Sequence, residues 1–490
     1  MLYEMLVSAA SESPGREAVE AHGTAVSYGE LRAAVDGFAS KLGALGFGKG
    51  DPVLVLLPNG AEFVIAVFAA AKLGGIVVPV NLSFQINELK FYLQDSGARA
   101  VVTTAELASR HGALIQDVNP GCHIVTSIPH PDSAPLEAAA ARASIDGDVL
   151  YQYSSGSTGT PKRVVRSQAN LVEEADNYTH TVKLTREDRI LAVVPMFHAH
   201  GFGNCLLATI RAGATLYTLE SFNRQQVIDA LVDKDITVFP GVPFMFSILA
   251  DSPSIAAARL PALRLAFSAG APLADKTFER FLHKFGVPVR QLYGSTETGS
   301  VAINMGRTAG DLWSSVGQAI HHVEVKIVDD DGQPAGVDQT GEIIIRSQAM
   351  TRGYANLEEV NRQSFRDGYF WSGDLGRLDR DGRLFISGRK TLFINVGGNK
   401  VDPAQIEALI DEHPAVAESV VLGVGGGHSQ EIIKAVVVCK QACDAEQIRD
   451  WCRGKVADFK VPRIVEFRAE IPRSPLGKIL RKYLQDEESH

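Results

Sequence analysis

Residues 149–162 read VLYQYSSGSTGTPK, in which a short apolar run leads into a loop of glycines and hydroxyl side chains that ends on Lys162. Glycines let the backbone approach a ligand closely and turn several N–H groups towards it. The neighbouring hydroxyls can donate hydrogen bonds to phosphate oxygens, and the lysine adds a mobile positive charge. A Ser/Gly-rich surface linker is the alternative interpretation of this composition. The position directly after a strand-like run favours a phosphate-binding loop.

Strand-like and helix-like segments alternate on both sides of this loop. Residues 52–57 (PVLVLL) form a short apolar run between turn residues, which predicts a buried strand. Ser27 and Glu30 have the spacing of a capping box at the start of a helix. A further helix is predicted at 62–73, and further strands at 76–80, 190–194, 215–219, 237–239 and 263–267. Such alternation predicts an α/β fold, with a mostly parallel sheet and helices on its faces.

The pattern changes after about residue 315. Short strands joined by Asp/Gly turns are predicted at 323–328, 341–346 and 383–386, which indicates a smaller antiparallel region. From residue 399 onward the pattern is that of a compact α+β unit, with helices at 403–412 and 445–456 and strands at 419–423 and 433–439. The turn near Gly388–Lys390 separates the two styles. We therefore expect a large N-terminal domain over 1–388 and a small C-terminal domain over 389–490.

The composition is that of a globular protein. The chain has 490 residues, too many for one ordinary core, of which 45% are hydrophobic and 21% charged. A net charge of -9 argues against a protein that coats nucleic acid. Five cysteines without a CxxC pair argue against a disulfide framework or a zinc site and favour a reducing cytoplasm. The apolar stretch 63–80 contains Lys72 and a Gly-Gly pair, so we expect a buried helix and strand there and no membrane span.

The phosphate loop resembles the signature loop of the adenylate-forming enzymes, which comprise acyl- and aryl-CoA synthetases, peptide-synthetase adenylation domains and beetle-type luciferases. It lacks the Gly-Lys-Ser/Thr ending of the Walker pattern. The resemblance extends from about Val26 to Leu484, with one departure at Arg163, where the family commonly has Gly. It implies that ATP, Mg²⁺ and CoA are ligands. It also implies phosphate contacts from Ser154, Ser155, Gly156, Ser157, Thr158, Gly159 and Lys162.

Residues 291–298 (QLYGSTET) are a second match to the family. Tyr293 offers a flat face for adenine, Thr296 a hydroxyl for a phosphate, and Glu297 a carboxylate of the kind that a divalent ion prefers. Without the loop upstream, the segment would pass for a turn with a surface Glu. The resemblance implies that Glu297 holds Mg²⁺ on the ATP phosphates. It further implies nucleotide contacts from Gly294, Gly270, Ala271 and Pro272.

Two further matches concern the ribose and a hinge. Asp374 ends the segment 369–374 (YFWSGD), and a carboxylate there can accept two hydrogen bonds from a ribose diol, although a plain turn Asp is the common alternative. In the family, the arginine matched by Arg389 also contacts ribose. Thr391 occupies the pivot of a rotation of the mobile C-terminal domain, where the family usually has Asp or Lys. The resemblance also implies a tunnel for the thiol arm of CoA, lined by Gly397 and Gly398.

The last match is the segment 472–481 (PRSPLGKILR). Taken by itself, this is a basic tail with solvated charges. The family pattern implies a catalytic lysine at Lys478, whose ammonium neutralises charge as the carboxylate of the acid attacks the α-phosphate. Lys478, Thr158 and Glu297 are thus the predicted catalytic residues, whereas Arg473, Arg481 and Lys482 are expected to be solvated.

Residues 195–202 (PMFHAHGF) match the acid pocket of acyl- and aryl-acid activators and lack the Asp with which amino-acid activators hold an α-ammonium. The paired histidines resemble those of enzymes for diacids, but 241–248 (GVPFMFSI) provides no Arg for a second carboxylate. We therefore expect an apolar acid, aromatic or aliphatic. Burial in the core is the usual fate of Phe, and is the alternative for some of these residues. The predicted pocket consists of His198, Phe244, Phe246, Phe267 and Ala269.

The expected enzyme is an acid–thiol ligase that forms an acyl-adenylate from a small carboxylic acid and ATP, releases pyrophosphate, and transfers the acyl group to CoA. The nearest alternative uses the phosphopantetheine thiol of a carrier protein as acceptor. A non-catalytic nucleotide-binding protein on this fold is disfavoured, and a luciferase-like oxidation would use the same motifs. No nucleic-acid or membrane partner is expected. The residues that argue against a non-catalytic protein are Glu297, Asp374, Arg389 and Lys478.

Overall fold

A first mostly parallel sheet contains the strands on either side of the phosphate loop. The computed structural model describes residues 2–84, 86–128, 147–154, 161–252, 260–306, 314–390, 394–396, 399–425, 431–453, 455–456, 458–474 and 479–485. The strand order of the sheet is β6-β5-β3-β4-β7-β8, and only β7 and β8 pair antiparallel. Its strands are β3 (Pro52–Leu56), β4 (Ile76–Pro79), β5 (Ala100–Thr103), β6 (His123–Val125), β7 (Asp148–Ser154) and β8 (Lys162–Ser167).

A second mostly parallel sheet has the strand order β15-β14-β13-β12-β11-β9-β10-β1-β2. The strands from β1 to β13 in this order run parallel, while β2, β14 and β15 pair antiparallel at the two edges. The strands predicted in both sheets are confirmed within a few residues at their ends. The bounds are β1 (Glu17–Ala21), β2 (Thr24–Ser27), β9 (Arg189–Ala192), β10 (Thr215–Thr218), β11 (Val238–Gly241), β12 (Leu265–Ser268), β13 (Val289–Ser295), β14 (Gly299–Ile303) and β15 (Gln318–Ala319).

The main core lies between the two sheets. The predicted helix becomes α3 (Ala61–Lys72), which is buried over nearly all its length, as expected of a helix that is apolar on every side. Its cluster of buried side chains joins Val53 and Val77 of the first sheet to Ile190 and Leu216 of the second. The two sheets are therefore stacked with helices between them. The other helices before residue 300 are α1 (Leu2–Glu12), α2 (Tyr28–Ala44), α4 (Ile86–Ser96), α5 (Ala105–Val118), α6 (Gln168–Val182), α7 (Ala208–Ala212), α8 (Arg224–Asp233), α9 (Pro243–Ala250) and α10 (Asp275–Phe285).

An antiparallel sheet follows, as predicted. Its order is β16-β17-β19-β18, and β20 pairs with β19. Asp374 on β19 lies opposite Arg389 on β20. This register places the two residues that are expected to contact ribose side by side. The elements are β16 (Val323–Val328), β17 (Gly341–Ser347), α11 (Glu358–Ser364), β18 (Phe365–Arg366), β19 (Tyr369–Leu378) and β20 (Leu384–Arg389).

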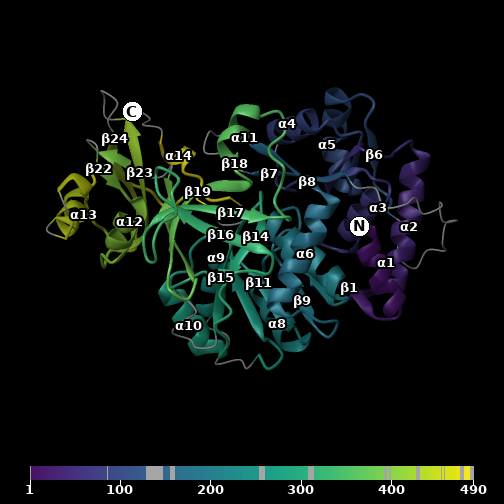
Figure 1. Cartoon of the computed structure of the whole chain (residues 1–490), viewed down its shortest axis with the longest axis horizontal. Coiled ribbons are helices and arrows are strands. Elements are labelled where there is room, and N and C mark those ends of the chain that lie inside the picture. Colours follow the sequence, from purple (N-terminus) through teal and green to yellow (C-terminus); the bar gives the residue numbers. More distant parts are fainter. Residues whose placement is uncertain are drawn as a thin grey trace.

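The described residues from 394 onward form hydrophobic clusters of their own. The helix predicted at 445–456 ends at Cys452, because Arg453 adopts an extended conformation with φ −59° and ψ 137°. Figure 1 shows α12, α13, β23 and β24 at one end of the molecule and α1, α2 and α5 at the other. The elements are β21 (Ile394–Val396), β22 (Asn399–Val401), α12 (Pro403–Asp411), β23 (Val416–Gly425), β24 (Glu431–Cys439), α13 (Ala445–Cys452), β25 (Ile464–Phe467) and α14 (Lys482–Gln485).

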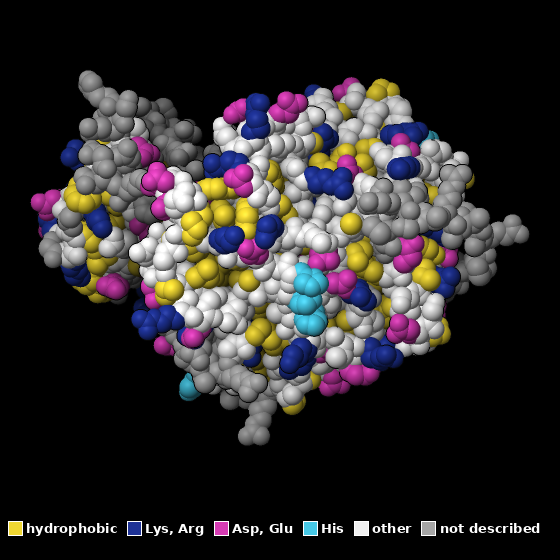
Figure 2. Space-filling model, viewed as in Figure 1, with side chains coloured by type: hydrophobic (Ala, Val, Ile, Leu, Met, Phe, Trp, Pro, Cys, Tyr) yellow, Lys and Arg dark blue, Asp and Glu magenta, His cyan; other side chains and the backbone are white. Residues whose placement is uncertain are grey.

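The surface carries charges of both signs. On the face shown in Figure 2, Lys and Arg side chains are interspersed with Asp and Glu, and histidine side chains form one compact cluster. His321 stacks on His180 and on His322, with ring centroids 3.9 and 3.8 Å apart. Among the described residues, the helices are all too short or too polar to cross a lipid bilayer.

Candidate active site

Thr296 and Glu297 lie in the turn of the hairpin that β13 and β14 form. A side chain at Gly294 would place its Cβ 2.4 Å from the carbonyl oxygen of Gly299, closer than atoms can approach. Gly299 itself has φ +69°, a conformation that residues with a side chain rarely adopt. The hairpin therefore requires glycine at both positions. It presents Thr296 and Glu297 at the carboxyl end of a strand, where α/β sheets commonly bind ligands.

Glu297 is buried and accepts a hydrogen bond from Tyr354. The Tyr354 hydroxyl donates to Oε1 of Glu297 at 2.8 Å, and the ring of Tyr354 lies 5.0 Å from Nζ of Lys162. Burial, followed by the charge of Glu297, raises the pKa of the Tyr354 phenol well above its ordinary value. The phenol is thus neutral and keeps its proton for the hydrogen bond. Tyr354 joins the lysine of the phosphate loop to the carboxylate that is predicted to hold Mg²⁺.

Sequence reasoning did not find Tyr354. Its place depends on a pairing between distant segments, in which Tyr354 forms an isolated bridge with Val164 on β8. The N–H of Ala355 also donates to the carbonyl oxygen of Arg163 at 2.9 Å. A single aromatic residue after Gly353 carries no local pattern that indicates such a pairing, so no signal in the segment marked it.

Asp374 holds two partners at once. The Tyr293 hydroxyl donates to Oδ2 at 2.6 Å, and Nε of Arg389 donates to Oδ1 at 2.5 Å. Burial and then the charge of Asp374 raise the pKa of the Tyr293 phenol. The predicted nucleotide residues Tyr293, Asp374 and Arg389 therefore meet in one network. Each carboxylate oxygen can accept a second hydrogen bond, so Asp374 can still bind a diol.

The flanks of the phosphate loop are an antiparallel pair. Ser154 at the end of β7 lies opposite Lys162 at the start of β8. Both predicted residues at the ends of the loop therefore belong to paired antiparallel strands. The other predicted phosphate contacts lie outside the described residues: Ser155, Gly156, Ser157, Thr158 and Gly159.

The segment Gly270–Pro272 is exposed at the carboxyl end of β12. The N–H of Ala269 donates to the carbonyl oxygen of Gly241 at 3.1 Å, and the N–H of Leu273 donates to Oε1 of Gln291 at 3.2 Å. These bonds tie the segment to β11 on one side and to β13 on the other. The exposed segment is therefore fixed at both of its ends, and its part in binding the nucleotide stays a prediction.

His200 is buried and belongs to a chain of hydrogen bonds. Its Nδ1 accepts from the Asn204 amide at 2.8 Å, Nε2 donates to the carbonyl oxygen of Gly241 at 3.2 Å, and the Ser300 hydroxyl donates to Oδ1 of Asn204 at 2.8 Å. Burial and then the nearby His198 lower the pKa of His200 to about 4. The imidazole is therefore neutral, and the amide and the carbonyl define its tautomer. Asn204 begins no motif in the sequence and was not predicted.

The residues predicted to form the acid pocket differ in their exposure. Phe246 packs between Phe239 and Phe281, with ring centroids 5.2 and 5.3 Å away, and Phe267 lies 6.2 Å from Tyr178. Both are fully buried, so they occupy the core, the alternative that their residue type favours. The predicted residues His198 and Phe244 are partly exposed, and Ala269 is buried at the end of β12. Their part in binding the acid stays a prediction.

Most of the residues predicted after residue 390 fall on parts that are not described. Lys478, Thr391, Gly397 and Gly398 lie outside the described residues. The expectation that Arg481 is solvated is wrong. Its guanidinium donates to Glu407 at 2.8 Å and to the carbonyl oxygen of Val421, and the side chain is 25% exposed. The charge is thus used to attach the C-terminal segment to α12 and β23.

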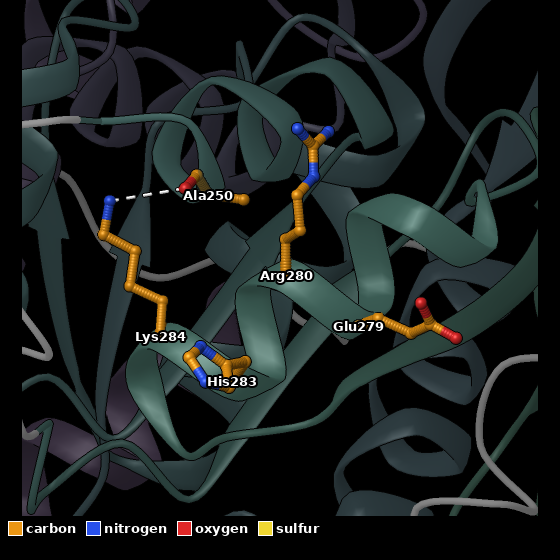
Figure 3. A pocket seen from close by; sticks show the side chains of 5 residues that line it. All are labelled: Ala250, Glu279, Arg280, His283 and Lys284. Atoms are coloured by element: carbon orange, nitrogen blue, oxygen red, sulfur yellow. Dashed lines mark hydrogen bonds between the residues drawn. The ribbon is translucent and has the colours of Figure 1, made fainter.

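A hollow of about 410 Å³ opens on the surface between α9 and α10 (Figure 3). Its lining residues are Ala250, Glu279, Arg280, His283 and Lys284. The Lys284 ammonium, which points towards α9 in Figure 3, donates to the carbonyl oxygens of Leu249 and Ala250, both at 3.3 Å. Lys284, which is partly exposed, therefore caps the carboxyl end of α9. The predicted nucleotide and acid residues do not line it.

Comparison with known proteins agrees with this geometry. The family model for AMP-binding enzymes matches residues 6–355, and the model for their C-terminal domain matches residues 405–478. A long-chain-fatty-acid–CoA ligase of Mycobacterium tuberculosis is 31% identical over 99% of this chain and 98% of its own length. A feruloyl-CoA synthase of Amycolatopsis is 31% identical over 97% of this chain and 96% of its own.

Solved structures are similar over the same extent. ATP-bound MatB of Rhodopseudomonas palustris has a TM-score of 0.89 at 28% identity, covering 99% of this chain and 98% of that one. The o-succinylbenzoate–CoA synthetase of Bacillus subtilis with its acyl-adenylate intermediate has a TM-score of 0.87 at 28% identity, with the same coverage. Family models, relatives and solved structures agree along nearly the whole chain, and we conclude that it belongs to the AMP-binding enzyme family.

Proposed function

We propose that this enzyme is an acyl- or aryl-CoA ligase, which activates a carboxylic acid as its acyl-adenylate and then transfers the acyl group to CoA. The observation that carries the proposal is the contact of Tyr354 with both Lys162 and Glu297. It brings a phosphate-binding cation and a metal-binding carboxylate together. Tyr293, on the same hairpin as Glu297, extends the site to Asp374. Sites for phosphate, metal and ribose are what an adenylation reaction needs.

The residues divide the nucleotide among them. Lys162 and the hydroxyls of the loop bind phosphate oxygens, Asp374 and Arg389 bind the ribose, and the Gly270–Pro272 segment lies along the adenine. The Glu297 carboxylate suits Mg²⁺, because it is a hard oxygen ligand fixed by a neutral donor. When bound there, Mg²⁺ would neutralise charge on the phosphates of ATP. Because two anions must meet, positioning and charge neutralisation supply most of the catalysis.

The second half of the reaction belongs to the C-terminal part. We assign the catalytic ammonium of adenylation to Lys478, the hinge to Thr391 and the thiol tunnel to Gly397 and Gly398. The division into domains 1–388 and 389–490 is part of this proposal. It is supported by the separate hydrophobic clusters that begin at Ile394. After adenylation, the C-terminal domain rotates and Lys478 leaves. The thiolate then attacks the carbonyl carbon of the adenylate, the bond from that carbon to the AMP oxygen breaks, and AMP is released with the thioester.

The acid is proposed to be apolar, either aromatic or aliphatic. The segment from Gly241 into α9 carries Val, Pro, Phe and Met and no cation for a second carboxylate. The buried imidazole of His200 is neutral and already bonded at both nitrogens, so it offers no charge either. Relatives named for fatty acids, ferulate and indoleacetate agree with an apolar acid.

Free CoA is the proposed acceptor, in preference to the thiol of a carrier protein. The relatives cited above are CoA ligases, and they match this chain from end to end. A cytoplasmic location is also part of the proposal, since Cys122, Cys205 and Cys452 are buried free thiols.

The test is a screen for pyrophosphate release with ATP and Mg²⁺ across aryl, aliphatic and dicarboxylic acids, with and without CoA. We expect release with apolar monoacids and thioester only with CoA. The Lys478→Ala variant should lose adenylation and keep thioester formation from a supplied acyl-adenylate. Thr158→Ala and Glu297→Gln should reduce adenylation. Normal adenylation by the Lys478 variant, or no release with any acid, would contradict the proposal.

A further inference from the structure

Both strands that flank the phosphate loop are attached to one residue of α4. Tyr153 and Arg163 lie opposite each other on β7 and β8. The Tyr153 hydroxyl donates to Oδ2 of Asp95 at 2.7 Å. Nε of Arg163 lies 3.5 Å from the same oxygen, and its Nη1 donates to the backbone carbonyl oxygen of Asp95. One aspartate thus receives a contact from each side of the hairpin.

Aromatic rings pack against Arg163 and Tyr153, while the Asp95 side chain is 32% exposed. The guanidinium of Arg163, whose side chain is 12% exposed, lies 4.8 Å from the ring centre of Tyr151. The ring of Tyr153 meets that of Tyr92, on α4, edge to face at 4.4 Å. Burial and then the bond to Asp95 raise the pKa of the Tyr153 phenol, so its O–H remains a donor. Shielding from water strengthens the ion pair and the cation–π contact compared with exposed ones.

This cluster lies next to Lys162, at the start of β8. Lys162 is the neighbour of Arg163 in β8, and its ammonium faces the ring of Tyr354. The backbone of β8 is therefore held from one side by Asp95 and from the other by Tyr354 and Ala355. At Arg163 the adenylate-forming enzymes commonly have Gly, which cannot make a side-chain contact with α4.

We propose that Asp95, Tyr153 and Arg163 form a clamp, the Asp95 clamp, which positions the two ends of the phosphate loop for ATP. This inference rests on the proposed function. The three residues are positioning residues, since their contacts are with each other and with α4. Because the clamp orders the binding site before ATP arrives, its loss weakens ATP binding more than the turnover of bound ATP or the binding of the acid.

The test is a set of variants assayed for pyrophosphate release. Arg163→Gly and Asp95→Asn should each raise the KM for ATP about tenfold, while kcat and the KM for the acid change less than about threefold. Arg163→Lys should recover part of the affinity, since it keeps the charge. Tyr153→Phe, which removes one hydroxyl, gives a milder variant in case the others fold poorly.

The matched control is Arg99→Gly on the same sheet. Arg99 also pairs with an aspartate, Asp51 at 2.7 Å, and also covers an aromatic ring, that of Phe47 at 5.6 Å. These residues lie where β3 and β5 begin, away from the loop. The control should leave the KM for ATP unchanged. Equal effects of Arg99→Gly and Arg163→Gly, or an unchanged KM in Arg163→Gly, would overturn the clamp.

A second readout separates the clamp from the proposed function. Trypsin cleaves after Lys162 only if β8 opens locally. Asp95→Asn, which keeps the trypsin sites at Lys162 and Arg163, should accelerate this cleavage about tenfold relative to the wild type and to Arg99→Gly, with the rest of the chain cut at unchanged rates. If the wild type released no pyrophosphate with any acid, the proposed function would fail, whereas the cleavage rates would still decide whether the clamp exists. Equal cleavage rates after Lys162 in the wild type and in Asp95→Asn would contradict the clamp.

A different observation points to a redox-sensitive pair in the C-terminal part. The sulfur atoms of Cys439, at the end of β24, and Cys443, just before α13, lie 2.6 Å apart, well inside ordinary contact. Both side chains are partly exposed, whereas Cys122, Cys205 and Cys452 are buried. We propose that Cys439 and Cys443 form an intramolecular disulfide in the presence of a disulfide oxidant such as oxidised glutathione.

The exchange is balanced by the oxidant. The thiolate of one cysteine attacks oxidised glutathione and displaces one glutathione thiolate, and the second cysteine then attacks the mixed disulfide and displaces the other. The pair loses two protons and two electrons, and the oxidant is reduced to two thiols. No other cysteine is needed.

Peptide mapping of the full chain tests this pair. Trypsin cuts at Lys440, between the two cysteines, so the bond would link the peptides 435–440 and 441–449. After treatment with oxidised glutathione and alkylation, we expect the linked peptides in the wild type and not in Cys443→Ser. Cys122, Cys205 and Cys452 should become alkylated only after unfolding. Recovery of both peptides unlinked, alkylated or each carrying glutathione, would overturn the proposal.

Discussion

The Tyr354 hydroxyl donates a hydrogen bond to Oε1 of Glu297 at 2.8 Å in the buried part of the site. The carboxylate is thereby fixed before any metal arrives, and the same tyrosine supports Lys162 through its ring. Replacing Tyr354 by Phe removes the hydroxyl and keeps the ring, so it separates the hydrogen bond to Glu297 from the contact with Lys162.

Tyr354→Phe should weaken the response to Mg²⁺ and leave the contact with Lys162 in place. A hydrogen bond to a charged group contributes about 1.5–3 kcal/mol, so we expect roughly a tenfold or greater loss of kcat/KM at limiting Mg²⁺. The measurement is pyrophosphate release as a function of Mg²⁺ concentration. Tyr369→Phe is the control, because its hydroxyl also donates to a glutamate, Glu324 at 2.9 Å, in the antiparallel sheet. An identical Mg²⁺ response in both variants would reject the role of Tyr354.

Asp374→Asn should raise the KM for ATP by at least about tenfold, because an amide offers one acceptor oxygen where Arg389 and Tyr293 now use two. Substitution of Arg389 by Lys should have a similar effect, since it cannot reproduce the guanidinium contact. Asp379→Asn changes another Asp–Arg pair, with Arg383 at 2.8 Å, at the turn of the same β19–β20 hairpin. This control should bind ATP normally. A normal KM in Asp374→Asn would exclude it from the ribose site.

Acid should destabilise the protein through His200. Its folded pKa, about 4, lies below the ordinary value of 6.5, so the unfolded state binds the proton first as pH falls. The stabilisation is complete above pH 6.5 and is lost between pH 6.5 and about 4, with a total of about 3 kcal/mol. Urea unfolding at several pH values should show that the stability difference between wild type and His200→Gln shrinks in this window. His283→Gln, at an exposed site, is the control, and a constant difference for His200→Gln would contradict the assignment.

Arg166 and Glu174 form an ion pair at 2.7 Å with side chains only 1% and 5% exposed. Nη1 of Arg166 also donates to the carbonyl oxygen of Thr296, next to Glu297, the proposed Mg²⁺ ligand. Arg166→Met should cost about 3–5 kcal/mol of unfolding free energy, because it leaves a carboxylate buried without its partner. Restoring neutrality with Glu174→Gln in the same chain should recover part of the loss.

Denaturant unfolding measures this pair, and an exposed pair provides the comparison. Arg110 and Glu106 lie at 3.1 Å with side chains 61% and 80% exposed. Arg110→Met should cost less than about 1 kcal/mol. Equal losses in Arg110→Met and Arg166→Met would show that burial does not decide the outcome.

Elements with local signals were predictable. The capping box of Ser27 and Glu30 forms as expected, because the two residues satisfy each other's backbone within one turn. The apolar run at 52–57 becomes the central strand β3, since it is bounded by turn residues and is too short for a buried helix. Motif residues such as Tyr293 and Asp374 could be named from the family resemblance, although their mutual hydrogen bond could not.

Features that depend on distant partners were not predictable. Tyr354 acquires its place from a bridge to Val164, and Asp95 from a hairpin about 60 residues away in the chain. The packing of Phe246 between two other rings could not be told from a pocket wall, because both environments are apolar. In each case the deciding contact is tertiary, and residue type alone leaves several environments equally favourable.

The bond between Asp374 and Arg389 joins the two strands of one hairpin, and both residues precede the proposed hinge at Thr391. A rotation about that hinge would therefore move the proposed catalytic lysine, Lys478, and the proposed thiol tunnel, while Asp374 and Arg389 stay with the N-terminal part. The acyl-adenylate would then stay bound at the same place during both half-reactions. An acyl-adenylate that stays bound has little opportunity to dissociate and hydrolyse in water. The hairpin would thus raise the yield of the reaction as well as its rate.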